Sequence, residues 1–416
     1  MRSLIIIYDE RSQLLKGAFY VGKYDFGKVI DRRGTSSLKY DFGIERRRRD
    51  DLLPLWVADM DFKLPDEILD DIKTRVDHGI FGYTDPKDDY AKAVATWFKK
   101  RHGFDIEYDW NIVVPGVVYA IAVAVRAFTE PGESVIIQEP VYYPFRETIE
   151  LNKRKVVNNQ LVYKNGHYEI DFEDFEKKIV EENVKLFLLC SPHNPAGRVW
   201  TKEELLRLGD ICLKHNVLIF ADEIHFDFVF KGYKHTPFIT LGEKYKDNLI
   251  LGTSPSKTFN IAGLQIANII IPNTSLRNKF DRENGAGGYS QCNVLGLVAT
   301  KACYEKGEQW VDELLDYLEG NLDYIRNFIK EKLPKVKLIE PEGTYLIWLD
   351  FSEVTTDYRD LRNLIENEAK LWLDGGIIFG RETALFERIN IASPKSIIEK
   401  AMEQLYEAYE KRYGET

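Results

Sequence analysis

The sequence predicts an α/β protein with a mostly parallel central sheet and a second, smaller α+β domain. Between about residues 110 and 270, short apolar runs alternate with amphipathic stretches, as strands and crossover helices do. The runs are rich in Val, Ile, Leu and Phe, which is typical of parallel strands buried on both faces. From about residue 305 the pattern changes to long charged helices around short strands. Because single cores rarely grow beyond about 250–300 residues, a length of 416 residues also favours two domains.

The predicted elements follow in chain order. Strands of the large sheet are predicted at residues 111–115, 134–138, 186–190, 217–221, 249–252 and 267–271, with helices at 118–128, 172–180 and 202–215 between them. In the C-terminal part we expect helices at 309–332 and 396–413 and strands at 344–350 and 388–391. Ligands of such a sheet bind at the carboxyl ends of its strands, so the residues that follow each strand are candidates for a site.

The composition argues against several classes of function. The net charge of −10 disfavours a nucleic-acid partner, which requires a basic surface. The arginine run at 46–49 is followed directly by two aspartates and is interpreted as solvated surface. The four cysteines lack CxxC or metal-ligand spacing, so we expect no disulfide framework and no metal site, and reduced thiols suit a cytoplasmic protein. We expect no membrane span or secretion signal, because no apolar stretch reaches about 18 residues.

The N-terminal 22 residues are expected to form an extension separate from the patterned sequence, which begins around Lys23. The segment 16–18 (KGA) could be encoded by a purine-rich ribosome-binding sequence, and Val21 by a GTG start codon. The natural protein would then begin at Val21. A genuine N-terminal arm is the alternative, and the DNA sequence or an N-terminal mass would decide between the two.

A lysine emerges where one predicted buried strand ends. Lys257 lies in the segment 254–259 (SPSKTF), directly after the strand at 249–252. A lysine amine condenses with an aldehyde, and a desolvated cleft lowers its pKa enough to make it a nucleophile and later a base. Ser254 and Ser256 offer hydroxyl donors for phosphate oxygens. The Ser-Lys pattern alone is weak evidence, because such pairs are common on protein surfaces.

Two other strand ends carry residues that suit the same ligand. Asp222 follows the strand at 217–221, and a buried carboxylate there would keep a pyridine nitrogen protonated, so that the ring acts as an electron sink. An aspartate that caps the next helix is the alternative. Asn194, in the segment 191–198 (SPHNPAGR), can donate a hydrogen bond to a phenolate oxygen. Three strand ends of one sheet would therefore converge on one aromatic ring.

Two upstream segments suggest a phosphate site and a stacking ring. The segment 115–120 joins a strand to a helix, where backbone N–H groups and the helix dipole favour a phosphate. Tyr142 follows the next strand and could stack on the pyridine ring. Core packing of Tyr142 against Tyr143 is the alternative, and it would be preferred if this pair stood alone.

Together these motifs resemble the fold-type I enzymes that depend on pyridoxal 5′-phosphate (PLP), the class I/II aminotransferase superfamily, from about Lys23 to the C-terminus. The segments 31–35 (DRRGT) and 54–62 (PLWVADMDF) are similar to signatures of its cystathionine β-lyase group, the cystalysin type. The resemblance implies a large PLP-binding domain at 76–310 with a seven-stranded sheet, and a small domain with an N-terminal arm at 23–75 and 311–416. It also implies a homodimer with shared active sites.

The resemblance assigns a role to each matching residue. Lys257 becomes the Schiff-base lysine, Asp222 the partner of the pyridinium nitrogen, and Asn194 the donor to the cofactor's O3′. Arg388, in the segment 387–392 (ERINIA), grips the substrate α-carboxylate, a task that suits a guanidinium fork; a surface arginine is the alternative. The other implied cofactor contacts are Tyr142, His225, Gly116, Val117, Val118, Ser254, Ser256 and, from a neighbouring subunit, Tyr83; the other carboxylate contacts are Val57, Ala58 and Asn194; and Tyr83 and Tyr119 assist catalysis.

Two positions depart from the wider superfamily and favour one reaction. Gln265 stands where most members have a phosphate-binding arginine, which leaves fewer fixed positive charges for the phosphate, and His225 stands where many have tyrosine. Because a histidine there is shared by β-lyases of this type, we expect a cysteine-S-conjugate β-lyase. It would convert cystathionine or another S-substituted L-cysteine into a thiol, pyruvate and ammonia. An aminotransferase is the main alternative, and a regulatory protein with this fold is the least favoured.

Overall fold

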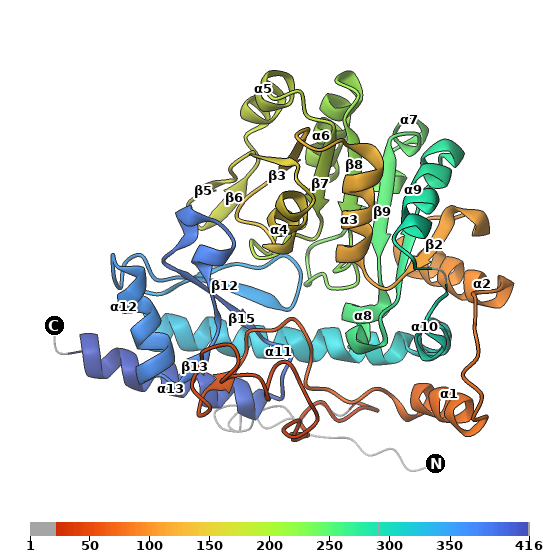
Figure 1. Ribbon diagram of the computed structural model, residues 1–416. Coiled ribbons are helices and arrows are strands. Elements are labelled where there is room, and N and C mark those ends of the chain that lie inside the picture. Colours follow the sequence, from red (N-terminus) through yellow and green to blue (C-terminus); the bar gives the residue numbers. More distant parts are fainter. Residues whose placement is uncertain (1–21, 290, 415–416) are drawn as a thin grey trace, which may run out of the picture.

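The computed structural model describes residues 22–289 and 291–414. The N-terminal extension predicted for residues 1–22, including the start proposed at Val21, lies outside the described residues except for Gly22. The chain forms two layered units, each built on its own sheet, and the long helix α11 (Glu308–Lys332) runs beneath both in the view of Figure 1. The domain boundaries expected from the sequence stay a prediction.

The large sheet has seven strands, as expected. Its order is β2-β10-β9-β8-β7-β3-β4, and β10 alone runs antiparallel to its neighbours. The six predicted strands are confirmed to within two residues at each end, whereas the edge strand β4 was not predicted. The strands are β2 (Asn111–Val114), β3 (Ser134–Ile137), β4 (Lys155–Asn158), β7 (Leu186–Cys190), β8 (Leu218–Asp222), β9 (Leu249–Thr253) and β10 (Ala267–Ile270).

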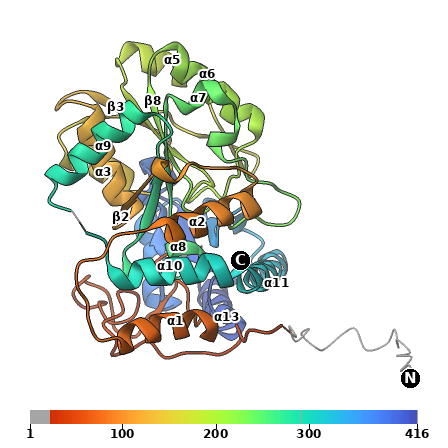
Figure 2. The same cartoon turned by 90° about the vertical axis from the view of Figure 1, so that its right-hand side faces the viewer.

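Helices cover both faces of this sheet (Figure 2). On one face lie α3 (Val117–Phe128), α4 (Pro144–Leu151) and α9 (Thr274–Ala286), and on the other α5 (Phe172–Glu181) and α6 (Lys202–Lys214). Successive strand residues point to opposite faces, so Leu188 joins one apolar cluster while Phe187 and Leu189 join the other. Burial on both faces explains why the strands read as continuous apolar runs.

The second sheet is antiparallel, with order β11-β12-β15-β14. The strand predicted at 344–350 begins at Leu346 instead. Thr344 has a left-handed φ of 68°, and its hydroxyl bonds both the N–H and the carbonyl of Leu346, so the chain turns before the strand begins. The elements of this part are β11 (Lys337–Ile339), β12 (Leu346–Asp350), β14 (Asp374–Gly375), β15 (Phe386–Asn390), α12 (Tyr358–Asn363) and α13 (Lys395–Tyr413).

The other elements lie outside the two main sheets. β1 (Leu53–Pro54) pairs in parallel with β13 (Leu371–Trp372) and so holds the N-terminal segment beside the second sheet. A hairpin of β5 (Val162–Lys164) and β6 (His167–Glu169) extends from the large unit. The remaining α-helices in the described residues are α1 (Asp66–Asp77), α2 (Asp88–Trp97), α7 (Glu243–Lys246), α8 (Pro255–Thr258) and α10 (Val294–Lys306). Within the described ranges, no helix is long and apolar enough to cross a membrane.

Candidate active site

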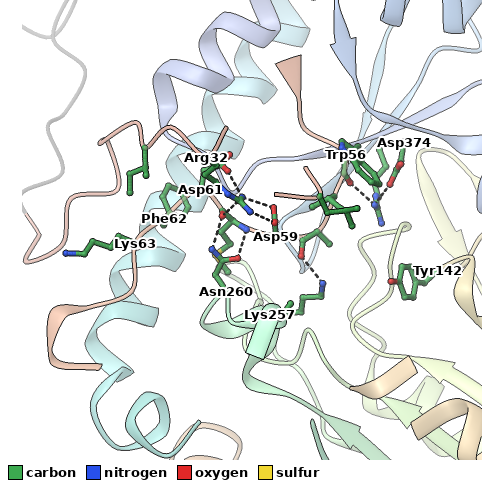
Figure 3. Close-up of a pocket in the computed structure, with 18 of the residues that line it drawn as sticks. Arg32, Trp56, Asp59, Asp61, Phe62, Lys63, Tyr142, Lys257, Asn260 and Asp374 are labelled. Atoms are coloured by element: carbon green, nitrogen blue, oxygen red, sulfur yellow. Dashed lines mark hydrogen bonds and ion pairs between the residues drawn. The ribbon is translucent and has the colours of Figure 1, made fainter. Parts of the chain in front are cut away.

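Two connected cavities lie at the carboxyl ends of the large-sheet strands. The outer cavity, of about 700 Å³, borders the segment 56–63 and the second sheet. The inner cavity, of about 450 Å³, is lined by the loops that follow β2, β7, β8 and β9. Lys257, Ala58, Tyr142 and Ala262 line both cavities, and Figure 3 shows the Lys257 amine pointing toward the side on which Trp56 and Asp59 lie. The site predicted at this edge of the sheet therefore forms around Lys257.

Lys257 is presented by the short helix α8, which begins directly after β9. Its Nζ donates a hydrogen bond of 2.8 Å to the carbonyl oxygen of Ala58. The pKa of Lys257 is lowered to about 8, mainly by burial; the nearby Arg388 acts in the same direction, while the carboxylates Asp59 and Asp222 oppose it. A substantial part of the amine is therefore neutral near pH 8 and can act as a nucleophile or base.

Asp222 ends β8 near Lys257, and its carboxylate forms no ion pair with the residues that the structure describes. Among the described residues, the one hydrogen bond to its carboxylate comes from the backbone N–H of Ile224, at 3.1 Å. Burial raises the pKa of Asp222 to about 7, and this exceeds the opposing effects of that hydrogen bond and of Lys257. A buried carboxylate of this kind is stabilised when a ligand brings a positive charge to it.

Arg388 reaches the site from β15 of the second sheet. Its Nη1 donates to Asn194 Oδ1 at 2.9 Å, and its Nη2 donates to the Trp56 carbonyl at 2.9 Å and to the Asp374 carboxylate. The Arg388 Nε is buried without a hydrogen-bond partner in the described part of the chain. Arg388 thus lines the outer cavity with donor capacity left for a ligand. Because its Nη1 already bonds the side-chain oxygen of Asn194, the amide nitrogen of Asn194 is left as a donor toward the inner cavity.

The buried imidazole of His225 follows Asp222 at the same strand end. Burial lowers the pKa of His225 far below its ordinary value, and Lys257 and Arg388 add to this effect. Its Nδ1 has no hydrogen-bond partner within the described residues. The ring packs at 5.7 Å, edge to face, against the ring of Tyr345. His225 is therefore a neutral group that lines the inner cavity with an unused polar atom.

The inner cavity ends at the N-terminus of α3, which has no side-chain cap. The free backbone N–H groups of Val117 and Val118 suit a phosphate there. Ser256 also lines this cavity, whereas the hydroxyl proton of Ser254 is already donated to the Ile266 carbonyl at 2.6 Å. Apart from Lys257, the described lining residues of the inner cavity include no lysine or arginine. Gln265, which stands where the wider superfamily pattern has an arginine, also lines this cavity.

Comparison with known proteins identifies the family. A model of the aminotransferase class I and II family matches residues 50–405. The chain belongs to this family. It is 43% identical over 384 residues to cystathionine β-lyase PatB of Bacillus subtilis, covering 92% of this chain and 98% of that protein. It is 35% identical over 387 residues to protein MalY of Escherichia coli, covering 92% and 98% of the two chains.

Solved structures agree with this assignment. The crystal structure of cystalysin from Treponema denticola, which contains a PLP cofactor, superposes with a TM-score of 0.90 at 41% identity, covering 94% of this chain and 99% of that chain. A PLP-bound C-S lyase from Staphylococcus hominis superposes with a TM-score of 0.86 at 35% identity, covering 94% and 99%. The fold-type I architecture and the resemblance predicted from the sequence motifs are both confirmed.

Two tyrosines predicted to assist catalysis are placed differently. Tyr119 lines the inner cavity, and its hydroxyl donates to Asn284 Oδ1 at 2.9 Å. Tyr83 is 94% exposed and lines neither cavity. A single chain therefore does not bring Tyr83 to the site, and its role across a subunit interface stays a prediction.

The sequence indicated the segment 54–62 but not what holds it. The Ala58 carbonyl accepts from the Tyr345 hydroxyl at 3.0 Å as well as from Lys257. Asn260 bonds both the N–H and the carbonyl of Met60 at 2.8 Å, and Asn390 donates to the Val57 carbonyl at 2.7 Å. Val57 and Ala58 thus face the site through backbone atoms, which the sequence motif alone could not reveal.

Charged residues of the two N-terminal motifs pair with each other. Arg32 donates to both carboxylate oxygens of Asp59, at 3.0 and 2.6 Å, and to Asp61. The buried Lys39 pairs with Asp61 at 2.7 Å (Figure 3 shows the cluster around Arg32). These ion pairs explain why the motifs at 31–35 and 54–62 occur together in one chain.

Searched over the residues that the structure describes, His, Cys, Asp and Glu form no group suited to a metal, and all four cysteines are free.

Proposed function

We propose that this protein is a PLP-dependent carbon–sulfur β-lyase that converts S-substituted L-cysteines, such as cystathionine, into a thiol, pyruvate and ammonia. The observation that carries the proposal is the position of the partly buried Lys257 amine, which lines both cavities and lies near enough to Asp222 and Arg388 for their charges to shift its pKa. Its relatives support the choice of reaction, since the 43% identical PatB is named a cystathionine β-lyase and a similar structure is a C-S lyase.

The inner cavity fits PLP on three independent observations. Asp222 is a buried carboxylate whose pKa is raised to about 7, and the protonated pyridine nitrogen would place a positive charge in contact with it. The uncapped N-terminus of α3 offers backbone donors for the phosphate. His225 Nδ1 is a buried polar atom in need of a partner. Lys257, Asp222, Asn194, Tyr142 and the backbone at 116–118 would hold the cofactor.

When bound, PLP supplies a ring that withdraws electrons from the substrate's α-carbon. The residues of this chain orient the substrate and move its protons. Arg388 would hold the α-carboxylate by a bidentate contact, beside the backbone of Val57 and Ala58. The Lys257 amine, which is partly neutral near pH 8, would remove the proton from the α-carbon.

Departure of the sulfur leaving group from the β-carbon is assisted by a proton donor, which converts the thiolate into the thiol. Lys257, once protonated, and Tyr119 are the two candidates that line the inner cavity. Burial raises the pKa of the Tyr119 hydroxyl, so it carries its proton at neutral pH. Tyr83 of a second subunit would help to keep the lysine neutral.

A homodimer would complete the site, and the exposed apolar loop around Tyr83 supports it. Ile80, Phe81 and Tyr83 are 65%, 56% and 94% exposed, which a second copy of the chain would cover. We further propose the domain division given above, at 76–310 for the cofactor domain, and a cytoplasmic location.

The test is an absorption spectrum of the purified protein before and after addition of L-cystathionine, with pyruvate and free thiol assayed in the same cuvette. A yellow protein that releases both products in equal amounts supports the lyase. A yellow protein that turns over only when an α-keto acid acceptor is present is an aminotransferase instead. A protein that takes up no PLP contradicts the proposal altogether.

A further inference from the structure

The arginine assigned to the substrate carboxylate already has an acidic neighbour. Asp374 lies directly opposite Arg388 in the β14–β15 ladder, so the two side chains share one face of the sheet. One oxygen of Asp374, Oδ2, accepts from Arg388 Nη2. The other, Oδ1, receives no hydrogen bond from the described residues. Its side chain is 11% exposed and lines the outer cavity, where Figure 3 shows it beside Trp56 and on the side of Tyr142.

The other carboxylates of the outer cavity are fully engaged. Asp59 binds both nitrogens of the Arg32 fork. Asp61 accepts from Lys39 at 2.7 Å, from the Ser393 hydroxyl at 2.5 Å, from the Tyr40 hydroxyl at 3.1 Å and from Arg32 at 2.9 Å. Among the described residues that line this cavity, Asp374 is thus the carboxylate with an oxygen left for a ligand.

Charge balance indicates which ligand group that oxygen suits. When a substrate α-carboxylate binds Arg388, two carboxylates share one buried guanidinium, which is unfavourable in a desolvated site. Burial raises the pKa of Asp374, whereas Arg388 and, more weakly, Arg48 and Arg46 act in the opposite direction. Neither Arg46 nor Arg48 forms an ion pair with it in the described part of the chain, because Arg46 packs over the Trp56 ring and Arg48 pairs with Glu366. A second positive charge on the substrate would restore the balance.

We propose that Asp374 is a specificity-determining residue that binds a second ammonium group on the substrate. The enzyme would then prefer thioethers with an amino group at both ends, such as cystathionine or cystine, over S-alkyl cysteines. A site with a buried acceptor for a substrate N–H discriminates against an analogue that lacks it, because the acceptor is left unpaired. The inference rests on the proposed lyase function for the reaction, although the binding preference itself is measurable without turnover.

The test compares two analogues in which carbon replaces sulfur, so that no thiolate can leave. L,L-2,7-diaminosuberate has the chain length of cystathionine and both amino groups, whereas L-2-aminosuberate lacks the distal one. Calorimetry on the PLP-loaded protein gives both dissociation constants. We expect the diamino compound to bind about tenfold more tightly, well above the twofold that two identical ends provide. Both compounds carry the α-carboxylate, so the ratio cancels any effect on Arg388 alone.

The variant Asp374→Asn should reduce this ratio to about two, and the control Glu382→Gln, an exposed residue outside both cavities, should leave it unchanged. Equal binding of the two compounds by the unmodified protein, or a preference retained in Asp374→Asn, overturns the proposal. The first of these measurements needs no variant, so a failure of Asp374→Asn to fold leaves the test intact. If cystathionine releases no pyruvate while the binding ratio stands, the lyase function fails and the role of Asp374 does not.

Discussion

Replacement of Asp222 by asparagine should increase the folding stability of the apo-protein and lower its affinity for the cofactor. The carboxyl pKa rises from an ordinary value of 3.8 to about 7 because burial disfavours the ionised form. Each tenfold change in a protonation equilibrium corresponds to about 1.4 kcal/mol, so ionised Asp222 costs about 4 kcal/mol of folding free energy at pH 8. Asparagine has nearly the same shape and carries no charge, so Asp222→Asn should recover most of that cost in the apo-protein.

The sign of the pH dependence follows from the direction of this shift. A carboxyl whose folded pKa is raised favours folding while it is protonated in both states, and this contribution is lost as the pH rises from 3.8 to about 7. The stability difference between Asp222→Asn and the unmodified apo-protein should therefore be about 2 kcal/mol at pH 5 and about 4 kcal/mol at pH 8. Urea unfolding followed by circular dichroism at the two pH values measures it.

Asp227 provides a matched control for this experiment. It is also buried, but His102 and Thr258 bond its carboxylate at 2.9 and 2.6 Å, and the pKa of Asp227 is lowered despite its burial. Asp227→Asn should therefore destabilise the apo-protein, with the opposite sign to Asp222→Asn. With PLP bound, Asp222→Asn should lower cofactor affinity, because the pyridinium loses its counter-charge. An Asp222→Asn apo-protein whose added stability is absent, or is the same at pH 5 and pH 8, would refute the reasoning.

Three further predictions concern the same site. Arg388→Lys keeps the charge but loses the planar fork, so kcat/KM for cystathionine should fall about 30- to 100-fold, or about 2–3 kcal/mol, in steady-state assays; an unchanged value would remove Arg388 from carboxylate binding. The rate of PLP uptake by the apo-protein should rise as the pH passes about 8 and then level off, because the neutral Lys257 amine attacks the aldehyde; stopped-flow absorbance measures it. Gln265→Arg adds a second cation to the inner cavity, where Lys257 is the one cationic side chain among the described lining residues, and we expect PLP to dissociate about tenfold more slowly on dialysis. Faster loss of PLP would argue against a phosphate site near Gln265.

The fold was predictable from the sequence where burial on two faces left a continuous apolar signal. β7 and β8 have no exposed face, and their apolar residues serve two clusters in alternation. The edge strand β4 was missed because Lys155 is exposed and Asn158 only partly buried, so no apolar run marks it. Local signals thus identify strands by the burial of their side chains, and an edge strand has too few buried positions to be recognised.

The residues at strand ends were predictable for a related reason. Asp222, Asn194 and Lys257 each follow a recognisable strand, and parallel strands that point the same way bring their ends together. Their order along the chain then sufficed for a resemblance to a family. Their environments were not predictable, because the pKa of Asp222 is raised mainly by burial, which is a property of the packed structure.

Contacts between residues far apart in the chain, both between the two sheets and within the second sheet, escaped sequence reasoning most completely, and they include the contact on which the proposed specificity rests. Arg388 and Asn194 are 194 residues apart in the chain but bond at 2.9 Å. Asp374 belongs to a two-residue strand with no apolar pattern, and only its register opposite Arg388 brings its carboxylate to the guanidinium. The chemistry of the reaction is therefore encoded in residues that local motifs reveal, whereas the choice of substrate depends on a pairing between strands that no local motif encodes. Within this family, sequence motifs should consequently predict the cofactor more reliably than the preferred thioether.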